Sequence, residues 1–195
     1  GLLRGLDAWW SLKGKDSFAL LGAIAIDGGG NSTAPVIAEH LLDLGYEVFL
    51  LLDTDKASPA DLINSVKEKG GTVFEWPDAS STEERIFLDV PWNTVIELVK
   101  FAEECEKSDS VRDNINNACK VQSLTEISDL TFPKSLDTNN FRRVLGTAAK
   151  NDSRPWFKDI ARGERLAEII APYLDQISGK PLAKTISSLR QWVDA

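Results

Sequence analysis

A short apolar run that ends in two aspartates constrains the fold of this chain more than any other stretch. Residues 48–52 are all apolar, and Asp53 and Asp55 follow at once. A continuous apolar run of this length is typical of a parallel strand that is buried on both faces. Open α/β sheets bind their ligands at the carboxyl ends of such strands. The sequence therefore predicts a functional site where this strand ends.

The spacing of the two aspartates favours a metal site. Side chains two residues apart on an extended segment point to the same side, so Asp53 and Asp55 would share one location. Two like charges there repel each other unless a cation lies between them. A hard divalent cation such as Mg²⁺ prefers oxygen ligands. Aspartate is also common in polar turns that end strands, so this spacing alone leaves both interpretations open.

The order of apolar and amphipathic segments predicts a parallel α/β sheet flanked by helices, followed by a helical subdomain. We expect an α/β core over residues 1–90 and a helical subdomain over residues 91–195. In the core, the pattern predicts helices at residues 1–13, 34–44 and 58–69, and strands at residues 18–26, 47–52 and 72–75. In the second half, it predicts helices at about 92–106, 108–120, 138–150, 155–175 and 180–194.

Charge and composition exclude several classes of function. The net charge of −8 argues against a self-sufficient basic clamp on nucleic acid, but not against a nuclease whose carboxylates approach phosphate through metal ions. His40, the one histidine, falls in a predicted helix, and no Ser-His-Asp arrangement is visible. Cys105 and Cys119 lack partners at zinc-site spacing. No stretch is apolar for long enough to span a membrane, and we expect a cytoplasmic protein.

A glycine loop, Gly28 to Gly30, lies between the first predicted strand and the next predicted helix. Glycine loops that cradle phosphates occur in this context. The loop lacks the Lys-Ser/Thr pair of a P-loop and the spacing of a dinucleotide-binding loop. A plain tight turn is therefore the favoured interpretation, with Asp27 beside the site.

Ser81 and Glu83 follow the strand predicted at residues 72–75, at the sheet edge where Asp53 and Asp55 are expected. A hydroxyl and a carboxylate two residues apart can both reach a metal ion or its water ligands. The favoured interpretation is that Ser80, Ser81 or Thr82 caps a helix whose first turn holds Glu83 or Glu84. The two interpretations are compatible with each other.

Lys158 stands near the start of a predicted helix, directly after two aromatic residues that would anchor the turn. A lysine in this position could place its point charge on a phosphate oxygen. An ordinary solvated lysine is the alternative interpretation, and Lys150 is the nearest rival for the same role.

Taken in order, these segments resemble a Toprim domain, the metal-binding α/β fold shared by topoisomerases, primases and some nucleases. Within that group the chain resembles the C-terminal nuclease region of the OLD (overcoming lysogenisation defect) family. Full-length members of that family carry an N-terminal ABC-type ATPase. The resemblance rests on the helix at residues 1–7, on Asp53-x-Asp55, on Ser81-x-Glu83 and on Lys158 in an aromatic segment.

The resemblance implies a divalent-metal-dependent endodeoxyribonuclease with two ions per site, Mg²⁺ or Mn²⁺, and with Ca²⁺ as a non-catalytic occupant. Asp53 and Asp55 would bind metal, Glu83 with Ser81 would hold the second ion or its water, and Lys158 would neutralise charge on the phosphate. It also implies DNA as substrate, an ATPase domain in the same full-length chain, a role in phage defence and no membrane partner. Homo-oligomerisation is left open.

One departure from the family pattern qualifies this expectation. The family has a Glu-x-x-x-Glu motif just upstream of the first helix, whereas this sequence begins at Gly1, after that point. We therefore expect a fragment that cleaves little or nothing by itself. The alternatives are a catalytically degenerate Toprim module with a regulatory or assembly role, and another Toprim or phosphotransfer enzyme that takes phosphate on an aspartate.

Overall fold

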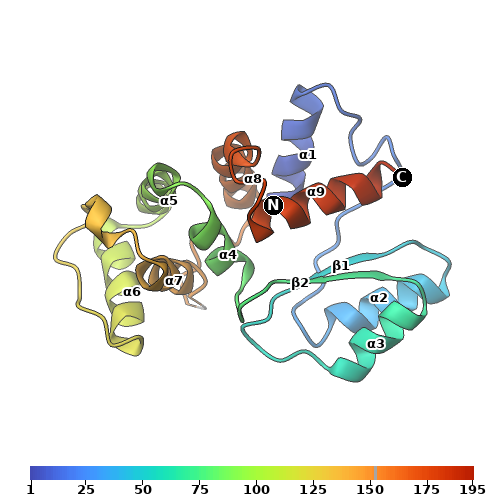
Figure 1. Ribbon diagram of the computed structural model, residues 1–195, viewed down its shortest axis with the longest axis horizontal. Coiled ribbons are helices and arrows are strands. Elements are labelled where there is room, and N and C mark those ends of the chain that lie inside the picture. Colours follow the sequence, from blue (N-terminus) through green and yellow to red (C-terminus); the bar gives the residue numbers. More distant parts are fainter. Residues whose placement is uncertain (152) are drawn as a thin grey trace.

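Two short parallel strands lie beside a larger set of helices in the computed structural model, which describes residues 1–151 and 153–195 (Figure 1). Strand β1 (Phe49–Leu52) pairs with β2 (Thr72–Glu75), with Phe49 opposite Thr72 and Leu52 opposite Glu75. The protein is thus mixed α/β and mostly helical, as the coarse prediction had it. The parallel sheet has two strands in the described part of the chain.

Helices lie on both sides of the sheet, but only one face of β1 is buried, whereas the apolar run predicted burial on both faces. On one face, Leu50 and Leu52 pack against helices α2 (Ala34–Asp43) and α3 (Ala60–Glu68). On the other, Phe49 and Phe74 stack with their ring centroids 4.8 Å apart. The Phe49 ring also packs against Trp192 of helix α9 (Pro181–Val193), with the ring centroids 5.8 Å apart. Figure 1 shows the two strands between α9 and the α2–α3 pair.

The remaining helices share a second and larger hydrophobic core. Aromatic rings lie at its centre. The ring centroids of Phe157 and Phe101 are 5.6 Å apart, and those of Trp156 and Phe87 are 6.2 Å apart. This core includes Leu6, so the first helix belongs with the helical part. The helices are α1 (Leu2–Leu12), α4 (Thr82–Asp89), α5 (Trp92–Cys105), α6 (Ser108–Val121), α7 (Asn139–Ala149) and α8 (Ile160–Ile170), with 3₁₀ turns at Lys134–Leu136 and Ala171–Tyr173. No described helix is both long and apolar enough to cross a bilayer.

Every helix predicted from the sequence is present, and the one at 155–175 is shorter than predicted. It begins at Ile160, because the side chain of Asp159 accepts a hydrogen bond from the Arg162 N–H and caps the first turn. It ends at Ile170, because Pro172 has no backbone N–H to donate to the carbonyl four residues earlier, and the chain continues as the 3₁₀ turn Ala171–Tyr173. The segment before α8 is therefore free to form a loop.

The strand predicted at residues 18–26 is wrong. This segment forms turns and irregular backbone, and Leu20 and Ile24 are 72% and 79% exposed. A strand needs neighbours for its backbone N–H and C=O groups, but β1 and β2 pair only with each other within the described residues. The start of the segment is instead fixed by the Phe18 N–H, which donates to the Asp7 carboxylate at 2.8 Å. Apolar composition alone misled the prediction.

Helices α4 and α7 cross so closely that Gly146 lies against the backbone of Glu84. A Cβ atom placed on Gly146 would be 2.4 Å from the Glu84 Cα and 2.9 Å from its backbone nitrogen. Only glycine permits this approach. The crossing brings the C-terminal end of α7 to the N-terminal turn of α4.

We expect Gly146→Ala to lower the free energy of unfolding by about 1–3 kcal/mol, because the added methyl group meets immobile backbone. The loss should appear even though alanine is the better helix former by about 1 kcal/mol. Urea unfolding measures it. Gly179→Ala is the matched control, since no atom lies within 4 Å of the added Cβ there. Equal stability of the two variants would contradict the close crossing.

Candidate functional site

The two aspartates lie at the carboxyl end of β1, as predicted, and the first of them is fixed by the start of α4. Asp53 Oδ1 accepts hydrogen bonds from the backbone N–H and the hydroxyl of Thr82, both at 2.9 Å. The indole of Trp76, just after β2, donates to the same hydroxyl at 2.9 Å. The ends of both strands are thereby joined to the first residue of α4.

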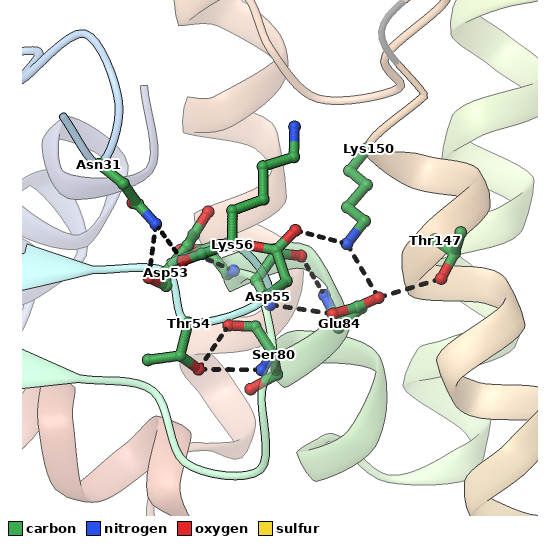
Figure 2. Close-up of polar contacts among 11 residues, drawn as sticks. Asn31, Asp53, Thr54, Asp55, Lys56, Ser80, Glu84, Thr147 and Lys150 are labelled. Carbon is green, nitrogen blue, oxygen red and sulfur yellow. Dashed lines mark hydrogen bonds and ion pairs between the residues drawn. The ribbon is translucent and has the colours of Figure 1, made fainter. Parts of the chain in front are cut away.

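The loops after β1 and β2 are folded onto each other through Thr54 (Figure 2). Its N–H donates to the Ser80 carbonyl at 3.0 Å, and its hydroxyl donates to the Trp76 carbonyl at 2.7 Å. The same hydroxyl accepts from the Ser80 N–H at 3.0 Å. Between Trp76 and Ser80, Asp78 and Ala79 adopt left-handed backbone with φ of 61° and 48°. This turn directs the chain from β2 into α4 at the sheet edge.

The glycine loop contributes an amide to the same edge. Asn31 Nδ2 donates to the backbone carbonyls of Asp53 and Lys56, both at 2.9 Å (Figure 2). The loop itself is a turn in which the Asp27 carboxylate accepts from the Gly29 N–H at 3.0 Å. The favoured interpretation as a tight turn fits this geometry. Asn31 holds the backbone of the Asp-x-Asp segment, a role that the sequence did not indicate.

Ser81 caps α4, which confirms one of the two compatible interpretations of this residue. Its hydroxyl accepts from the Glu84 N–H at 3.2 Å, and the Glu84 carboxylate accepts from the Ser81 N–H at 2.9 Å. This reciprocal pair is a capping box. The spacing of serine and glutamate was visible in the sequence, but the prediction named Glu83 as the site carboxylate and passed over Glu84.

A lysine from α7 completes the cluster. Lys150 Nζ lies 2.8 Å from Asp55 Oδ2 and 3.0 Å from Glu84 Oε1, and the Thr147 hydroxyl donates to that same glutamate oxygen at 3.0 Å (Figure 2). The ammonium group therefore bridges carboxylates from two different elements. Three segments distant in sequence meet here: the end of β1, the start of α4 and the end of α7. We call Asp53, Asp55, Glu84 and Lys150 the acidic cluster.

Burial shapes the charges in and beside the acidic cluster. It raises the pKa of Asp53, with a further upward contribution from Asp55 and opposition from the Thr82 hydrogen bonds. Burial likewise raises the pKa of Glu83, and the nearby Asp53 charge adds to that shift. For Lys150, burial lowers the pKa, but the hydrogen bonds to Asp55 and Glu84 outweigh it and the net shift is upward. The lysine is thus held as a cation among acids.

The donor chemistry fits a hard divalent ion, although the described residues do not converge on one. The carboxylates of Asp53, Asp55 and Glu83 and the hydroxyl of Ser81 offer oxygen ligands only, the type that Mg²⁺ and Mn²⁺ prefer. Within residues 1–151 and 153–195, no three His, Cys, Asp or Glu side chains are grouped closely enough to hold one ion. In this arrangement the Lys150 ammonium supplies the positive charge that Asp55 and Glu84 share.

The structure places Lys158 away from these contacts. It is exposed and lines an open hollow with Glu106, Arg154 and Arg162. None of its hydrogen bonds or ion pairs in the described part of the chain reaches an acid of the cluster. Lys150, the rival lysine, contacts one of the four predicted metal-site residues, Asp55, and its second partner is Glu84. His40 is exposed on α2, away from any role in the cluster.

Comparison of the chain with protein-family models, with curated proteins and with solved structures found no match.

We expect Asp53→Asn to raise the melting temperature near pH 7, because it removes a charge that burial disfavours. The pKa of Asp53 is raised in the folded state, so the folded state binds this proton more tightly than the unfolded state does. Stability therefore falls as pH rises from the ordinary carboxyl range through the raised pKa. Asparagine keeps the oxygen that accepts from Thr82. Melting curves from about pH 4 to pH 8, with a chelator present, measure the effect.

The gain should shrink toward pH 4, where the wild-type carboxyl is itself protonated. Asp113→Asn, an exposed change on α6, is the control and should leave the melting temperature nearly constant. A variant less stable than wild type at pH 7 would show that the Asp53 charge contributes favourably to folding.

Proposed function

We propose that this chain is the catalytic region of a Toprim-type enzyme that hydrolyses phosphodiester bonds with divalent metal ions. Within that class, we propose a DNA endonuclease of the OLD family. The observation that carries the proposal is the meeting of Asp53 and Asp55, at the carboxyl end of a parallel strand, with Glu84 of α4 and Lys150 of α7. Carboxylates and a charged lysine at such an edge are the groups that phosphoryl transfer requires.

Each residue then has a defined task. Asp53, Asp55 and Glu83, with Ser81, would hold Mg²⁺ or Mn²⁺, which when bound supplies an activated water and stabilises the leaving oxygen. Thr82 and Asn31 fix the Asp53 carboxylate and backbone, so that little rearrangement is needed at the moment of reaction.

The lysine would serve the phosphate. Glu84 and Asp55 hold the Lys150 ammonium at the edge of the cluster, and the ammonium would neutralise charge that develops on a phosphate oxygen. This assignment moves the phosphate-neutralising role from Lys158 to its rival. The acids then have two functions, because they hold the lysine charged as well as offering ligands.

Plasmid cleavage by the full-length protein tests the proposal. We expect nicking or linearisation of supercoiled DNA with Mg²⁺ or Mn²⁺, little or none with Ca²⁺ or EDTA, and loss of cleavage in Asp53→Ala and Asp55→Ala. Lys184→Ala, an exposed change on α9, is the control and should cleave as wild type does. Absence of cleavage with every metal ion would reject the nuclease.

A non-catalytic module is the second candidate, favoured by one observation. Lys150 already neutralises Asp55 and Glu84, and the described acids do not converge on a single ion position. A degenerate Toprim domain with a regulatory or assembly role would have acids that are neutralised by a lysine and that do not bind metal. It predicts that Asp53→Ala leaves every activity of the full-length protein unchanged, whereas the nuclease predicts its loss.

A further inference from the structure

A second charged feature lies on the segment that follows Lys150. An open hollow of about 570 Å³ is formed where the loop between α7 and α8 meets the C-terminal end of α5. Its lining is mostly charged, and three of the lining side chains are cationic. The lining residues are Glu106, Ser153, Arg154, Pro155, Lys158, Asp159 and Arg162. We call it the cationic hollow.

Packing and hydrogen bonds hold the loop of the hollow and two of its cations in place. Trp156 is fully buried and Phe157 nearly so, and both anchor the loop in the helical core. The guanidinium of Arg154 donates to the Ser110 hydroxyl at 2.8 Å. The guanidinium of Arg162 donates to the Cys105 carbonyl at 3.3 Å. A ligand would therefore meet an anchored loop and an Arg154 guanidinium that is already held, which lowers the entropic cost of binding.

The balance of charge favours an anion. Arg162 is paired with Glu106 and with Asp159, both at 2.9 Å, so its charge is neutralised locally. Within the described residues, no carboxylate lies at ion-pair distance from Arg154 or Lys158, and both are exposed. The chain as a whole carries a net charge of −8. The described lining holds three cations and two acids, so this hollow has a surplus of positive charge on an acidic protein and attracts negative charge.

The hollow also lies within reach of the acidic cluster. Lys150, Arg154 and Lys158 are spaced four residues apart on one segment. Eight residues span at most about 29 Å, so the Cα of Lys158 cannot be farther than that from the Cα of Lys150. The Trp156 N–H donates to the Ala149 carbonyl at 3.0 Å, which folds the segment back and shortens the span. One DNA duplex could therefore contact both places, since a strand carries a phosphate about every 3.4 Å along the helix axis.

We propose that the cationic hollow binds a backbone phosphate of the DNA substrate, with Lys158 and Arg154 as its ligands. The choice of DNA as ligand rests on the proposed nuclease function. Lys158 then positions the substrate, while Lys150 acts at the reacting phosphate. Phosphate contacts of this kind fix the register of a duplex and are not sequence-specific.

Fluorescence anisotropy tests the proposal. The full-length protein is titrated into a labelled 20-base-pair DNA duplex, with EDTA present so that no cleavage occurs, at several salt concentrations. We expect Lys158→Glu to weaken binding by about tenfold and to reduce the slope of log K against log salt by about 1, since one phosphate contact is lost. Arg154→Gln should weaken binding in the same direction. Lys184→Glu, at an exposed lysine that lines a different hollow, is the matched control.

The outcomes separate the two proposals. The proposed phosphate site is rejected if Lys158→Glu and Arg154→Gln bind the duplex with affinities within twofold of that of Lys184→Glu and with equal salt slopes. This holds even if the protein cleaves DNA. A wild-type protein that does not bind the duplex would overturn it as well. If the wild type binds the duplex, the two variants bind it more weakly and no metal ion supports cleavage, then the phosphate site is supported and the nuclease activity is rejected. Melting curves confirm that the exposed substitutions leave the fold intact.

Discussion

Replacing Lys150 with alanine in the full-length protein is expected to slow DNA cleavage by about 100-fold or more, while metal binding survives. The ammonium lies 2.8 Å from Asp55, a proposed metal ligand, and 3.0 Å from Glu84, so it is held at the edge of the proposed metal site. Its removal takes a positive charge away from the reacting phosphate but leaves every oxygen ligand in place. The acids also lose a competing cation, so affinity for a divalent ion should stay the same or increase.

The measurement pairs single-turnover cleavage with calorimetric titration of Ca²⁺, which reports ion binding without turnover. Asp53→Ala is the contrasting variant, because it should lose both ion binding and cleavage. Lys150→Arg keeps the charge but not the compact ammonium, and we expect only partial recovery of the rate. Cleavage by Lys150→Ala within threefold of wild type would remove this lysine from the chemistry and would leave its contacts a purely structural role.

Replacing Asp89 with alanine is expected to lower the free energy of unfolding by about 3–5 kcal/mol, the largest change in stability that we predict. The Asp89 and Arg85 side chains are only 2% and 6% exposed, and they pair at 2.7 Å within α4. The second Asp89 oxygen accepts from the Leu182 N–H, in the first turn of α9, at 2.8 Å. Alanine would leave a buried guanidinium whose remaining acid, Asp78, is 3.4 Å away and mostly exposed.

Urea unfolding of the isolated chain measures this loss, with Glu168→Ala as the control. Glu168 pairs with Arg165 at 2.7 Å, a distance equal to that of the buried pair, but both partners are more than half exposed. A surface pair of this kind contributes about 0–1 kcal/mol. If Asp89→Ala also costs less than about 1 kcal/mol, water must reach Arg85 and the pair is not buried in solution.

Two local structural features of the candidate site could be predicted from the sequence. The apolar run before Asp53 and Asp55 indicated a buried strand, and the spacing of Ser81 and Glu84 is a recognisable helix cap. Both signals lie within a few consecutive residues. They do not require knowledge of what packs against them, and so they could be found without the structure.

The choice between the two lysines could not be made in this way. Which of them reaches Asp55 is decided by the close crossing of α4 and α7 at Gly146, a contact between segments 62 residues apart in sequence. The aromatic residues before Lys158 suggested an anchored turn, and Trp156 and Phe157 are indeed buried. That anchoring places Lys158 in the hollow with Arg162 instead of at the acidic cluster. Tertiary packing therefore determines which lysine contacts Asp55, and the local sequence pattern does not.

The failed strand prediction has the same origin. Residues 18–26 have the composition of a buried strand, yet β1 and β2 pair only with each other within the described residues. Hydrogen bonding to a neighbour, more than apolar composition, determines whether such a run becomes a strand.

The exposed residues of that same segment have a consequence for the behaviour of the chain in concentrated solution. Leu20, Ile24 and Ile26 lie in an uncharged, proline-free run, a composition that promotes association between molecules. Mutual repulsion at a net charge of −8 opposes that association. High salt screens the repulsion, and acidification removes it. The colloidal stability of the isolated chain should therefore be greatest in dilute buffer at neutral to alkaline pH.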